Sequence, residues 1–491
     1  MILRRWLKSN YHFLALVIFF CFHGFNEYDG LIELTDFFLF AATLLFSSYF
    51  LFWFYNIFYK NKLKAGLITT GTLFIILFFG VMQDALIFYK SLAFLSGPVY
   101  FIPLMLGLFL VFLFLIWKVK KWQEFILYVQ LLLLLLIIFE TGNLFYRSFT
   151  NKTKSVNGTV VCNNCLKLPV YVLVLDEYAG DTTLSGIYNY DNNAFKGALT
   201  NQGFFDVKAS QSNYVLTVHS VASFLNMNYL PLQISSSGSE NAYGYKTALA
   251  MIKENIVAKK FQEVGYEIKN YSPFDFKNAP ATISNEFWGG NIRLITSQMM
   301  HRRLLKQLPF FAARNKFIKL PELLSNRYYN HIEFALSGSV KYARNNSVKP
   351  VFTYIHLNLP HSPILFDSLG NRFHKSVIKK WTPALLNQPY LWNLKKANEL
   401  TLKWVSEIKK AHSGNVVILI MSDHGPSPAG EHKRRTDNLN VVFLPNGNYS
   451  NWYSGFSNVN QFRVLFNNLF HESWPMLKDT AYNVKTDPLT D

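Results

Sequence analysis

The hydrophobic positions divide the chain into two parts with different patterns. The first 150 residues contain five apolar runs, and most are long enough to cross the hydrocarbon core of a bilayer as α-helices. The pattern predicts membrane helices at 11–25, 37–58, 66–88, 97–117 and 124–146. The first run is the shortest. Because bulky residues follow it where a small-residue cleavage site would be needed, we expect an uncleaved anchor and not a signal peptide.

Beyond the apolar part, strand patterns alternate with helix patterns. The predicted strands are 168–175, 266–272, 351–357, 416–421 and 439–445, and the predicted helices include 247–265 and 393–412. Continuous Val, Ile and Leu in several of these strands is typical of strands buried on both faces. The sequence therefore predicts a mostly parallel sheet flanked by helices, in an α/β domain. We expect a transmembrane domain at 1–148, a linker at 149–166 and the α/β domain at 167–485.

Basic residues give the membrane part its orientation. They gather in alternate loops, as Arg4, Arg5, Lys8, Lys60, Lys62, Lys64, Lys118, Lys120 and Lys121. Because Lys and Arg stay on the cytoplasmic side, the N-terminus is expected inside, and five spans then place the chain after Tyr146 outside. Much of the formal charge of +18 is explained in this way. The positive charge therefore gives no reason to expect a nucleic-acid partner.

A second basic stretch, 291–327, alternates with apolar residues in the outer part of the chain. We interpret it as one or two amphipathic helices on anionic lipid head groups. A solvated basic helix face remains an alternative. Cys162 and Cys165 form an exported CxxC, which is typical of a local disulfide; no second ligand pair accompanies them for structural zinc.

Three of the predicted strands end in side chains that can bind metal. Asp176 and Glu177 follow the first strand, His361 follows the 351–357 strand, and Asp423 and His424 follow the 416–421 strand. Ligands of parallel sheets bind beyond the carboxyl ends of the strands. Taken singly, each residue has a structural alternative as a turn, cap or packed loop residue. Together they predict a metal site built on loops at one edge of the sheet.

A possible nucleophile lies at the start of another helix. The i, i+3, i+4, i+7 spacing of Val218, Val221, Ala222 and Leu225 predicts that this helix begins near Thr217. A hydroxyl at that position has free backbone N–H groups around it, a setting that favours phosphate. The alternative is that Thr217 serves as the N-cap.

This order of motifs, behind five membrane spans, resembles the alkaline-phosphatase and sulfatase superfamily. Within it, the chain is most similar to the membrane-anchored phosphoethanolamine transferases and lipoteichoic acid synthases. The resemblance implies that Thr217 is the nucleophile and that histidines contact the transferred group. It implies the metal ligands Glu177, Thr217, Asp423 and His424, and the substrate-contacting residues His361 and His432. Asp176 stands where these transferases typically have Gly.

The resemblance implies a function at a bacterial inner membrane. We expect a phosphorylated head group to move from a membrane phospholipid, through phosphothreonine, to a hydroxyl of an envelope glycan or lipid. The expected ligand types suit zinc or manganese better than calcium. Two alternatives stay open: a sulfatase-like hydrolase with water as acceptor, and a non-catalytic protein that binds envelope polymers. Sulfate-ester hydrolysis through formylglycine needs a Cys or Ser in a C/S-x-P/A-x-R context. It is disfavoured, because none of the three cysteines lies near the helix start and Arg is absent there.

Overall fold

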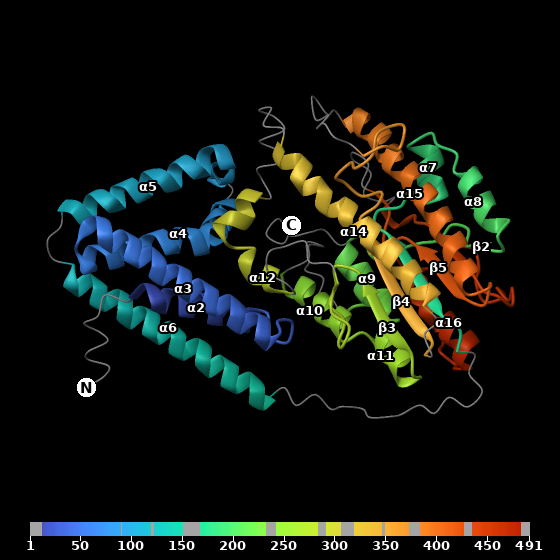
Figure 1. The fold of residues 1–491 in the computed structure, drawn as a ribbon, viewed down its shortest axis with the longest axis horizontal. Helices are drawn as coiled ribbons and strands as arrows, with labels where there is room; N and C mark the ends of the chain where they lie inside the picture. The colour runs from blue at the N-terminus through green and yellow to red at the C-terminus, as the bar shows by residue number, and fades with distance from the viewer. Residues whose placement is uncertain are drawn as a thin grey trace. The chain divides into compact units, whose positions relative to one another are not determined.

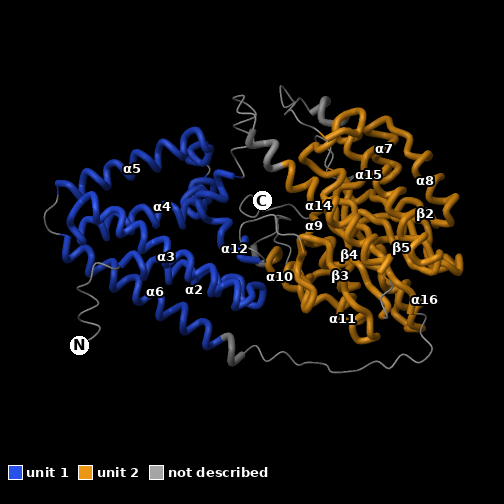
Figure 2. The backbone as a smooth tube through the Cα atoms, in the orientation of Figure 1, with its two compact units in different colours: residues 1–157, 286–311 blue, residues 158–285, 312–491 orange. Residues whose placement is uncertain are grey.

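The computed structural model describes residues 12–89, 91–118, 122–150, 167–231, 242–282, 291–305, 319–345, 349–372, 383–426 and 435–482. Several residues singled out from the sequence lie outside these ranges: Cys162, Cys165, His432 and the basic residues Arg4, Arg5, Lys8, Lys120 and Lys121. The chain separates into two compact units, which Figure 2 shows in different colours. The membrane unit comprises residues 1–157 and 286–311, and the α/β unit comprises residues 158–285 and 312–491.

Five apolar helices form most of the membrane unit, as the hydrophobic pattern predicts. They are α2 (His12–Glu27), α3 (Leu34–Tyr59), α4 (Lys62–Phe88), α5 (Pro98–Lys118) and α6 (Gln123–Thr150), with a 3-10 turn η1 (Ala93–Ser96) and a short helix α12 (Ile292–Thr296). Within the described residues, α3 to α6 are long and apolar enough to cross a membrane, whereas α2 has 16 residues. The predicted apolar helices are therefore confirmed, and α2 is the shortest of them.

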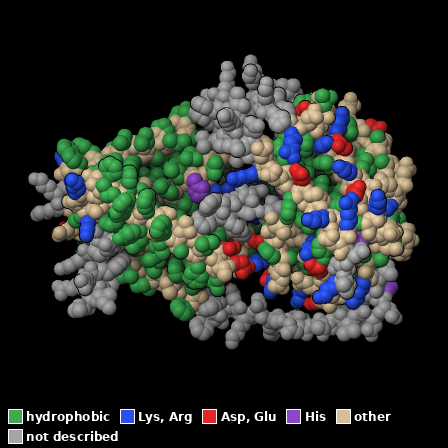
Figure 3. Space-filling model, viewed as in Figure 1, with side chains coloured by type: hydrophobic (Ala, Val, Ile, Leu, Met, Phe, Trp, Pro, Cys, Tyr) green, Lys and Arg blue, Asp and Glu red, His purple; other side chains and the backbone are tan. Residues whose placement is uncertain are grey.

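Burial distinguishes α2 from α3, α5 and α6. Phe13, Val17 and Phe20 of α2 are buried among residues of α3, α4 and α6. Large apolar side chains of α3, α5 and α6 remain exposed, and hydrophobic side chains cover the visible face of this unit in Figure 3. An apolar outer surface of this extent is what a helix bundle presents to lipid.

The α/β unit contains six strands and the remaining described helices. The strands are β1 (Val170–Leu175), β2 (Phe205–Asp206), β3 (Glu267–Tyr271), β4 (Val351–Leu357), β5 (Val417–Met421) and β6 (Asn440–Phe443). The helices are α7 (Asp181–Gly186), α8 (Asn193–Thr200), α9 (Thr217–Leu225), α10 (Ala242–Lys253), α11 (Ile256–Glu263), α14 (Lys319–Arg344), α15 (Pro383–Ala411), η3 (Asn458–Asn460) and α16 (Gln461–Phe470).

The six strands form one mostly parallel sheet in the order β2-β6-β5-β1-β4-β3. Strands β3, β4, β1 and β5 are parallel to one another. At one edge, β6 pairs antiparallel with β5, and β2 pairs antiparallel with β6. The predicted fold class is thus confirmed. In the register of the centre, Leu175 pairs with Leu357 and Val174 with Met421, so β1, β4 and β5 end at the same edge.

Helices cover both faces of the sheet (Figure 1). On one face, α7, α8, α14 and α15 bury a core that includes Tyr171 and Leu173 of β1. On the other, Phe352 of β4 stacks on Phe261 of α11 and contacts Phe462 of α16 edge-on. Because neighbouring side chains of a strand point to opposite faces, a central strand between two helix layers must be apolar at every position.

The helix expected at 247–265 is two helices, which corrects the sequence interpretation. Helix α10 ends at Lys253 and α11 begins at Ile256. Asn255 between them is the N-cap of α11, and its Oδ1 accepts the backbone N–H of Ala258 at 2.7 Å. The apolar period runs through both helices, so periodicity alone does not mark this break, although Asn is a favoured N-cap residue.

Candidate functional site

Three metal-binding side chains converge beyond the carboxyl ends of β1 and β5. Asp176, Asp423 and His424 each offer one ligand atom, and these atoms all lie within 4.8 Å of one another. Asp176 directly follows β1, and Asp423 lies two residues after the end of β5. All three residues are buried. Neighbouring parallel strands therefore bring together residues far apart in the sequence.

A network around Ser422 fixes the loop that carries Asp423 and His424. The Ser422 hydroxyl donates to the His424 carbonyl at 2.6 Å and accepts the backbone N–H of Tyr178 at 2.9 Å. Ser220, on α9, donates its hydroxyl to the Asp423 carbonyl at 2.6 Å. The β5 loop is thus tied both to the residues after β1 and to the helix that begins at Thr217.

The two aspartates keep acceptor atoms without hydrogen bonds. Asp423 Oδ1 accepts the backbone N–H groups of His424 and Glu177 at 2.8 and 3.1 Å. Asp423 Oδ2 and Asp176 Oδ1 are buried and have no hydrogen-bond partner within the described residues. Burial alone would raise the pKa of Asp176, but His361, His356 and His424 outweigh it and lower that pKa. Asp176 is therefore held as a carboxylate.

His424 presents a nitrogen lone pair to the same point. Its Nδ1 lies 2.9 Å from the carbonyl oxygen of Gly425, which assigns the proton to Nδ1. Its Nε2 then faces Asp423 Oδ2 at 3.4 Å and the Thr217 hydroxyl oxygen at 3.2 Å. A backbone carbonyl that receives one ring N–H while the other nitrogen stays free is the usual arrangement of a metal-binding histidine.

Thr217 is the first residue of α9, and its hydroxyl does not cap the helix. The N-cap is Leu216, in extended conformation. The capping alternative for Thr217 is therefore wrong. Its Oγ1 instead contacts His424 Nε2 and remains partly accessible. The structure thus brings Thr217, Asp423 and His424 together, three of the four residues that the resemblance implies as ligands.

Glu177, the fourth implied ligand, lies beside the cluster with its carboxylate turned to other partners. Its Oε1 accepts an Arg435 N–H at 3.1 Å, and its Oε2 lies 3.9 Å from His361 Nε2. The Glu177 backbone is left-handed, with φ of +58°, and its carbonyl accepts the Tyr390 hydroxyl at 2.8 Å. A non-glycine residue with positive φ is uncommon and cannot be read from an acidic pair in a sequence.

His361 lies on the same edge, after β4. Its backbone N–H donates to the carbonyl of Asp176 at 3.1 Å, and its Nδ1 contacts the carbonyl of Ser362. Burial would lower the pKa of His361, but Asp176, Glu177, the Ser362 carbonyl and Asp423 together raise it to about 9. Since its side chain is 35% exposed, His361 combines a stabilised positive charge with access to a substrate.

The cluster fits a divalent cation. Three atoms no more than 4.8 Å apart share a point at most about 2.8 Å from each, and small contractions reach the roughly 2.0–2.2 Å of zinc–oxygen and zinc–nitrogen bonds. A bound cation would compensate the negative charge of the buried carboxylate oxygens that have no hydrogen-bond donor, which a water molecule would not do. Two carboxylates, an imidazole and a nearby hydroxyl form a donor set suited to zinc or manganese.

Two residues near the cluster were not predicted from the sequence. His356, on β4, is buried, and its Nε2 lies 3.9 Å from Asp176 Oδ2. Its position inside an apolar strand resembles a packed core histidine. Arg435 reaches Glu177 from the segment before β6, and only its place as the last residue of "GEHKRR" offers a signal.

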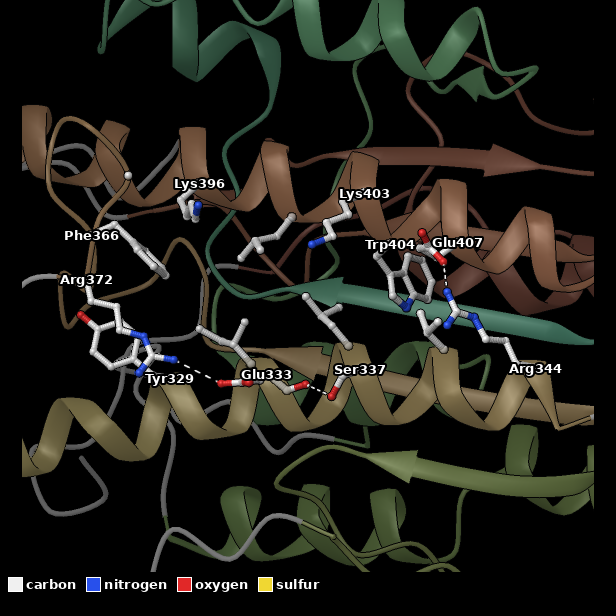
Figure 4. A pocket seen from close by; sticks show the side chains of 15 residues that line it. Tyr329, Glu333, Ser337, Arg344, Phe366, Arg372, Lys396, Lys403, Trp404 and Glu407 are labelled. Carbon is white, nitrogen blue, oxygen red and sulfur yellow. Dashed lines mark hydrogen bonds and ion pairs between the residues drawn. The ribbon is translucent and has the colours of Figure 1, made fainter.

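A groove elsewhere in the α/β unit presents a different lining. It lies between α14 and α15, has a volume of about 590 Å³ and is floored by apolar residues such as Leu336 and Trp404. Its arginines already have acidic partners: Arg372 pairs with Glu333 at 3.2 Å, and Arg344 pairs with Glu407 (Figure 4). Its described lining contains no imidazole, whereas the strand-end cluster offers two carboxylates and an imidazole.

Comparisons with known proteins agree with this location. The family model described as Sulfatase matches residues 169–464, a stretch that includes all of the clustered residues. No curated protein matches the chain.

Several solved structures are similar at low sequence identity. The integral membrane lipooligosaccharide phosphoethanolamine transferase EptA from Neisseria meningitidis is 14% identical over 94% of this chain and 96% of that chain, with a TM-score of 0.36. The periplasmic domain of EptC from Escherichia coli in complex with Zn is 11% identical over 67% of this chain and 89% of that chain, with a TM-score of 0.39. A phosphonate monoester hydrolase of Agrobacterium radiobacter is 12% identical over 62% and 73%, with a TM-score of 0.39.

Proposed function

The chain belongs to the sulfatase family, and from this premise we propose that it is a metal-dependent phosphotransferase acting on a membrane lipid. The group transferred is a phosphorylated head group of phosphoethanolamine or phosphoglycerol type. Its acceptor is a hydroxyl of an envelope glycan or lipid. The observation that carries the proposal is the 3.2 Å approach of the Thr217 hydroxyl to His424, beside two buried aspartates.

We propose Asp176, Asp423, His424 and Thr217 as the residues that hold the ion, zinc or manganese. When bound, such an ion would favour ionisation of the nearby hydroxyl and offset charge on the phosphoryl group. Glu177, which the resemblance implies as a ligand, has its carboxylate on Arg435 and near His361. We therefore assign Glu177 the role of holding these two cationic groups where the transferred phosphoryl oxygens would lie.

In the first step, Thr217 attacks the phosphorus of the lipid phosphodiester. The bond from Thr217 Oγ1 to phosphorus forms, and the bond from phosphorus to the diacylglycerol oxygen breaks. The hydroxyl proton of Thr217 leaves to water. The leaving oxygen takes a proton from His361, whose raised pKa keeps its imidazole protonated at neutral pH. The products are diacylglycerol and a head group esterified to Thr217 through its phosphate.

In the second step, His361 acts as a general base. Now neutral, it accepts the proton of the acceptor hydroxyl as that oxygen attacks phosphorus. The bond to Thr217 breaks, and Thr217 regains a proton from water. Arg435 and Glu177 stay fixed through both steps because Arg435 also has its backbone carbonyl bonded to the Gly425 N–H, at 2.6 Å. The site returns to its starting state.

The attached apolar bundle supports a lipid donor. A phospholipid phosphodiester is met only at a bilayer surface, and a soluble hydrolase has no need of four helices long enough to span one. The cationic loops of the apolar part support an extracytoplasmic position of the α/β unit, at the bacterial inner membrane. The same chemistry with water as acceptor would make the protein a phosphodiesterase.

Mass spectrometry of the peptide containing Thr217 tests the proposal. We would purify the full chain from its own membranes, as wild type and as His361→Ala, in which turnover is slowed. We expect a covalent adduct on Thr217 whose mass identifies the head group, and none in Thr217→Ala. Release of free head group without acceptor would identify a hydrolase. An unmodified Thr217 in both proteins, with metal bound, would refute the phosphothreonine intermediate.

A further inference from the structure

One segment of the chain lies in the sequence of the outer part but belongs to the membrane unit. Residues 286–311 group with the membrane helices, although the α/β unit precedes and follows them (Figure 2). Their described part, Asn291–Leu305, is here called the docking segment. It begins at Asn291, whose side-chain amide donates to the carbonyl of Leu31, between α2 and α3, at 3.1 Å.

The docking segment fits a kink in α4. Phe78 interrupts α4 with non-helical angles, φ of −108° and ψ of 16°. The backbone N–H of Gly80, two residues later, donates to the carbonyl of Gln298 at 2.8 Å. A Cβ atom on Gly80 would lie 2.9 Å from Gln298 Cα and 2.7 Å from Arg303 Nε. Only glycine at this position allows the two backbones to approach so closely.

A bidentate ion pair stands next to this contact. Arg303 donates from both terminal nitrogens to the carboxylate of Asp84, at 2.9 and 2.6 Å, and from Nε to the carbonyl of Ser297 at 3.0 Å. The side chains of Arg303 and Asp84 are 17% and 15% exposed. Forked pairs of this kind are directional, and loss of one partner leaves the other charge poorly solvated.

Apolar side chains complete the contact on two sides. Ile292, Ile295 and Met299 pack into the main core of the bundle. Met300 and Leu304 pack against a second cluster, formed by Phe79, Phe101 and Met105 of α4 and α5. The docking segment is therefore matched to the bundle by shape, by charge and by a freed backbone amide, and its described contacts are with backbone groups and side chains of the bundle.

We propose that the docking segment is a tether that keeps the α/β unit within reach of the lipid donor. The inference rests on the proposed function. With the segment docked, Thr282 and Asn291 are nine residues apart and stay within about 32 Å, at up to ~3.5 Å per residue. The linker from Thr150 to Lys167 alone spans seventeen residues, which allows about 60 Å. Docking thus reduces the accessible volume by about sevenfold and raises the effective concentration of the site at the bundle.

Gly80→Ala tests the tether, with Gly107→Ala as the matched control. Gly107 is a glycine of α5 with no atom within 4 Å of its would-be Cβ. Full-length holoprotein would be assayed in phosphatidylethanolamine and phosphatidylglycerol vesicles for diacylglycerol release, and with bis(4-nitrophenyl) phosphate as a soluble substrate. For Gly80→Ala we expect diacylglycerol release to fall about sevenfold or more and soluble turnover to stay within about twofold. Gly107→Ala should match the wild type with both substrates.

Exchanging the charges of Asp84 and Arg303 distinguishes loss of docking from a folding defect. Asp84→Arg and Arg303→Asp should each reduce lipid turnover, and the double exchange should restore at least part of it. An equal loss with both substrates, or unchanged lipid turnover in Gly80→Ala, would overturn the tether. A wild-type protein that is active on the soluble substrate but never on lipid would refute the proposed function itself, and the tether with it.

Discussion

Asp176→Asn is expected to empty the metal site, and Glu177→Gln is expected to leave it filled. Both changes replace a carboxylate by an amide of the same shape. Asp176 contributes to the cluster of three ligand atoms, whereas Glu177 pairs with Arg435. Comparing the two variants therefore distinguishes the carboxylate that binds the ion from the carboxylate that positions the neighbouring cationic side chains.

The magnitude follows from the charge removed. Opposite unit charges about 4 Å apart attract by about 4 kcal/mol at an effective dielectric constant near 20, and a divalent ion in contact feels more. We therefore expect Asp176→Asn to cost at least about 3 kcal/mol of binding free energy, roughly a hundredfold in affinity. Glu177→Gln acts through Arg435 and His361, and we expect a loss of less than about tenfold in affinity but a clear fall in turnover.

The assay is metal content after equilibration. Detergent-purified full chain would be dialysed against buffers of defined free zinc, and bound zinc measured by inductively coupled plasma mass spectrometry. Thermal unfolding with and without chelator gives a second measure, because an ion that binds only the folded state raises its stability. Loss of zinc in Glu177→Gln with retention in Asp176→Asn would refute the ligand assignment and restore Glu177 as the ligand.

Two further predictions concern the loops around the cluster. In chelator-treated protein, the raised pKa of His361 means that its charge stabilises the fold fully below about pH 6.5, and that this contribution is lost as pH rises through about 9. The melting temperature of wild type should fall over that interval more steeply than that of His361→Gln; parallel curves would contradict the shift. Asn393 is buried, with Oδ1 accepting the N–H groups of Leu365 and Phe366 and Nδ2 donating to Pro360. Asn393→Ala should cost about 2–3 kcal/mol of unfolding free energy, against less than about 0.5 kcal/mol for the exposed Asn448→Ala, by chemical denaturation.

The sequence predicts the location of the site because strong local signals coincide with it. Strands β1 and β5 are continuous apolar runs and β4 is mostly apolar, and such runs predict central strands whose ends share one edge. The resemblance to the sulfatase superfamily, made on Glu177, Thr217, His361 and the "SDHG" stretch, is confirmed by the family match. The roles of the individual residues stay predictions, and His432 lies outside the described residues.

The finer arrangement depends on features with no local signal. Whether Asp176 or Glu177 faces the cluster depends on the left-handed backbone at Glu177, which tertiary contacts impose. The antiparallel direction of β6 depends on the path of the chain between β5 and β6. In the basic stretch 291–327, Arg303 is bound to Asp84 of α4, a pairing that charge periodicity cannot reveal.

The Arg303–Asp84 pair also has a consequence for the order of assembly during synthesis. The two residues are 219 positions apart, so at about 5–20 residues per second Arg303 is made roughly 10–40 s after Asp84. During that interval α4 carries its acidic side chain and the free Gly80 amide without the partner that later covers them. The membrane unit is therefore completed only after more than 100 residues of the α/β unit have been translated. A chain truncated between α6 and Asn291 would therefore expose the Asp84 carboxylate and the Gly80 amide, which Arg303 and Gln298 cover in the complete chain.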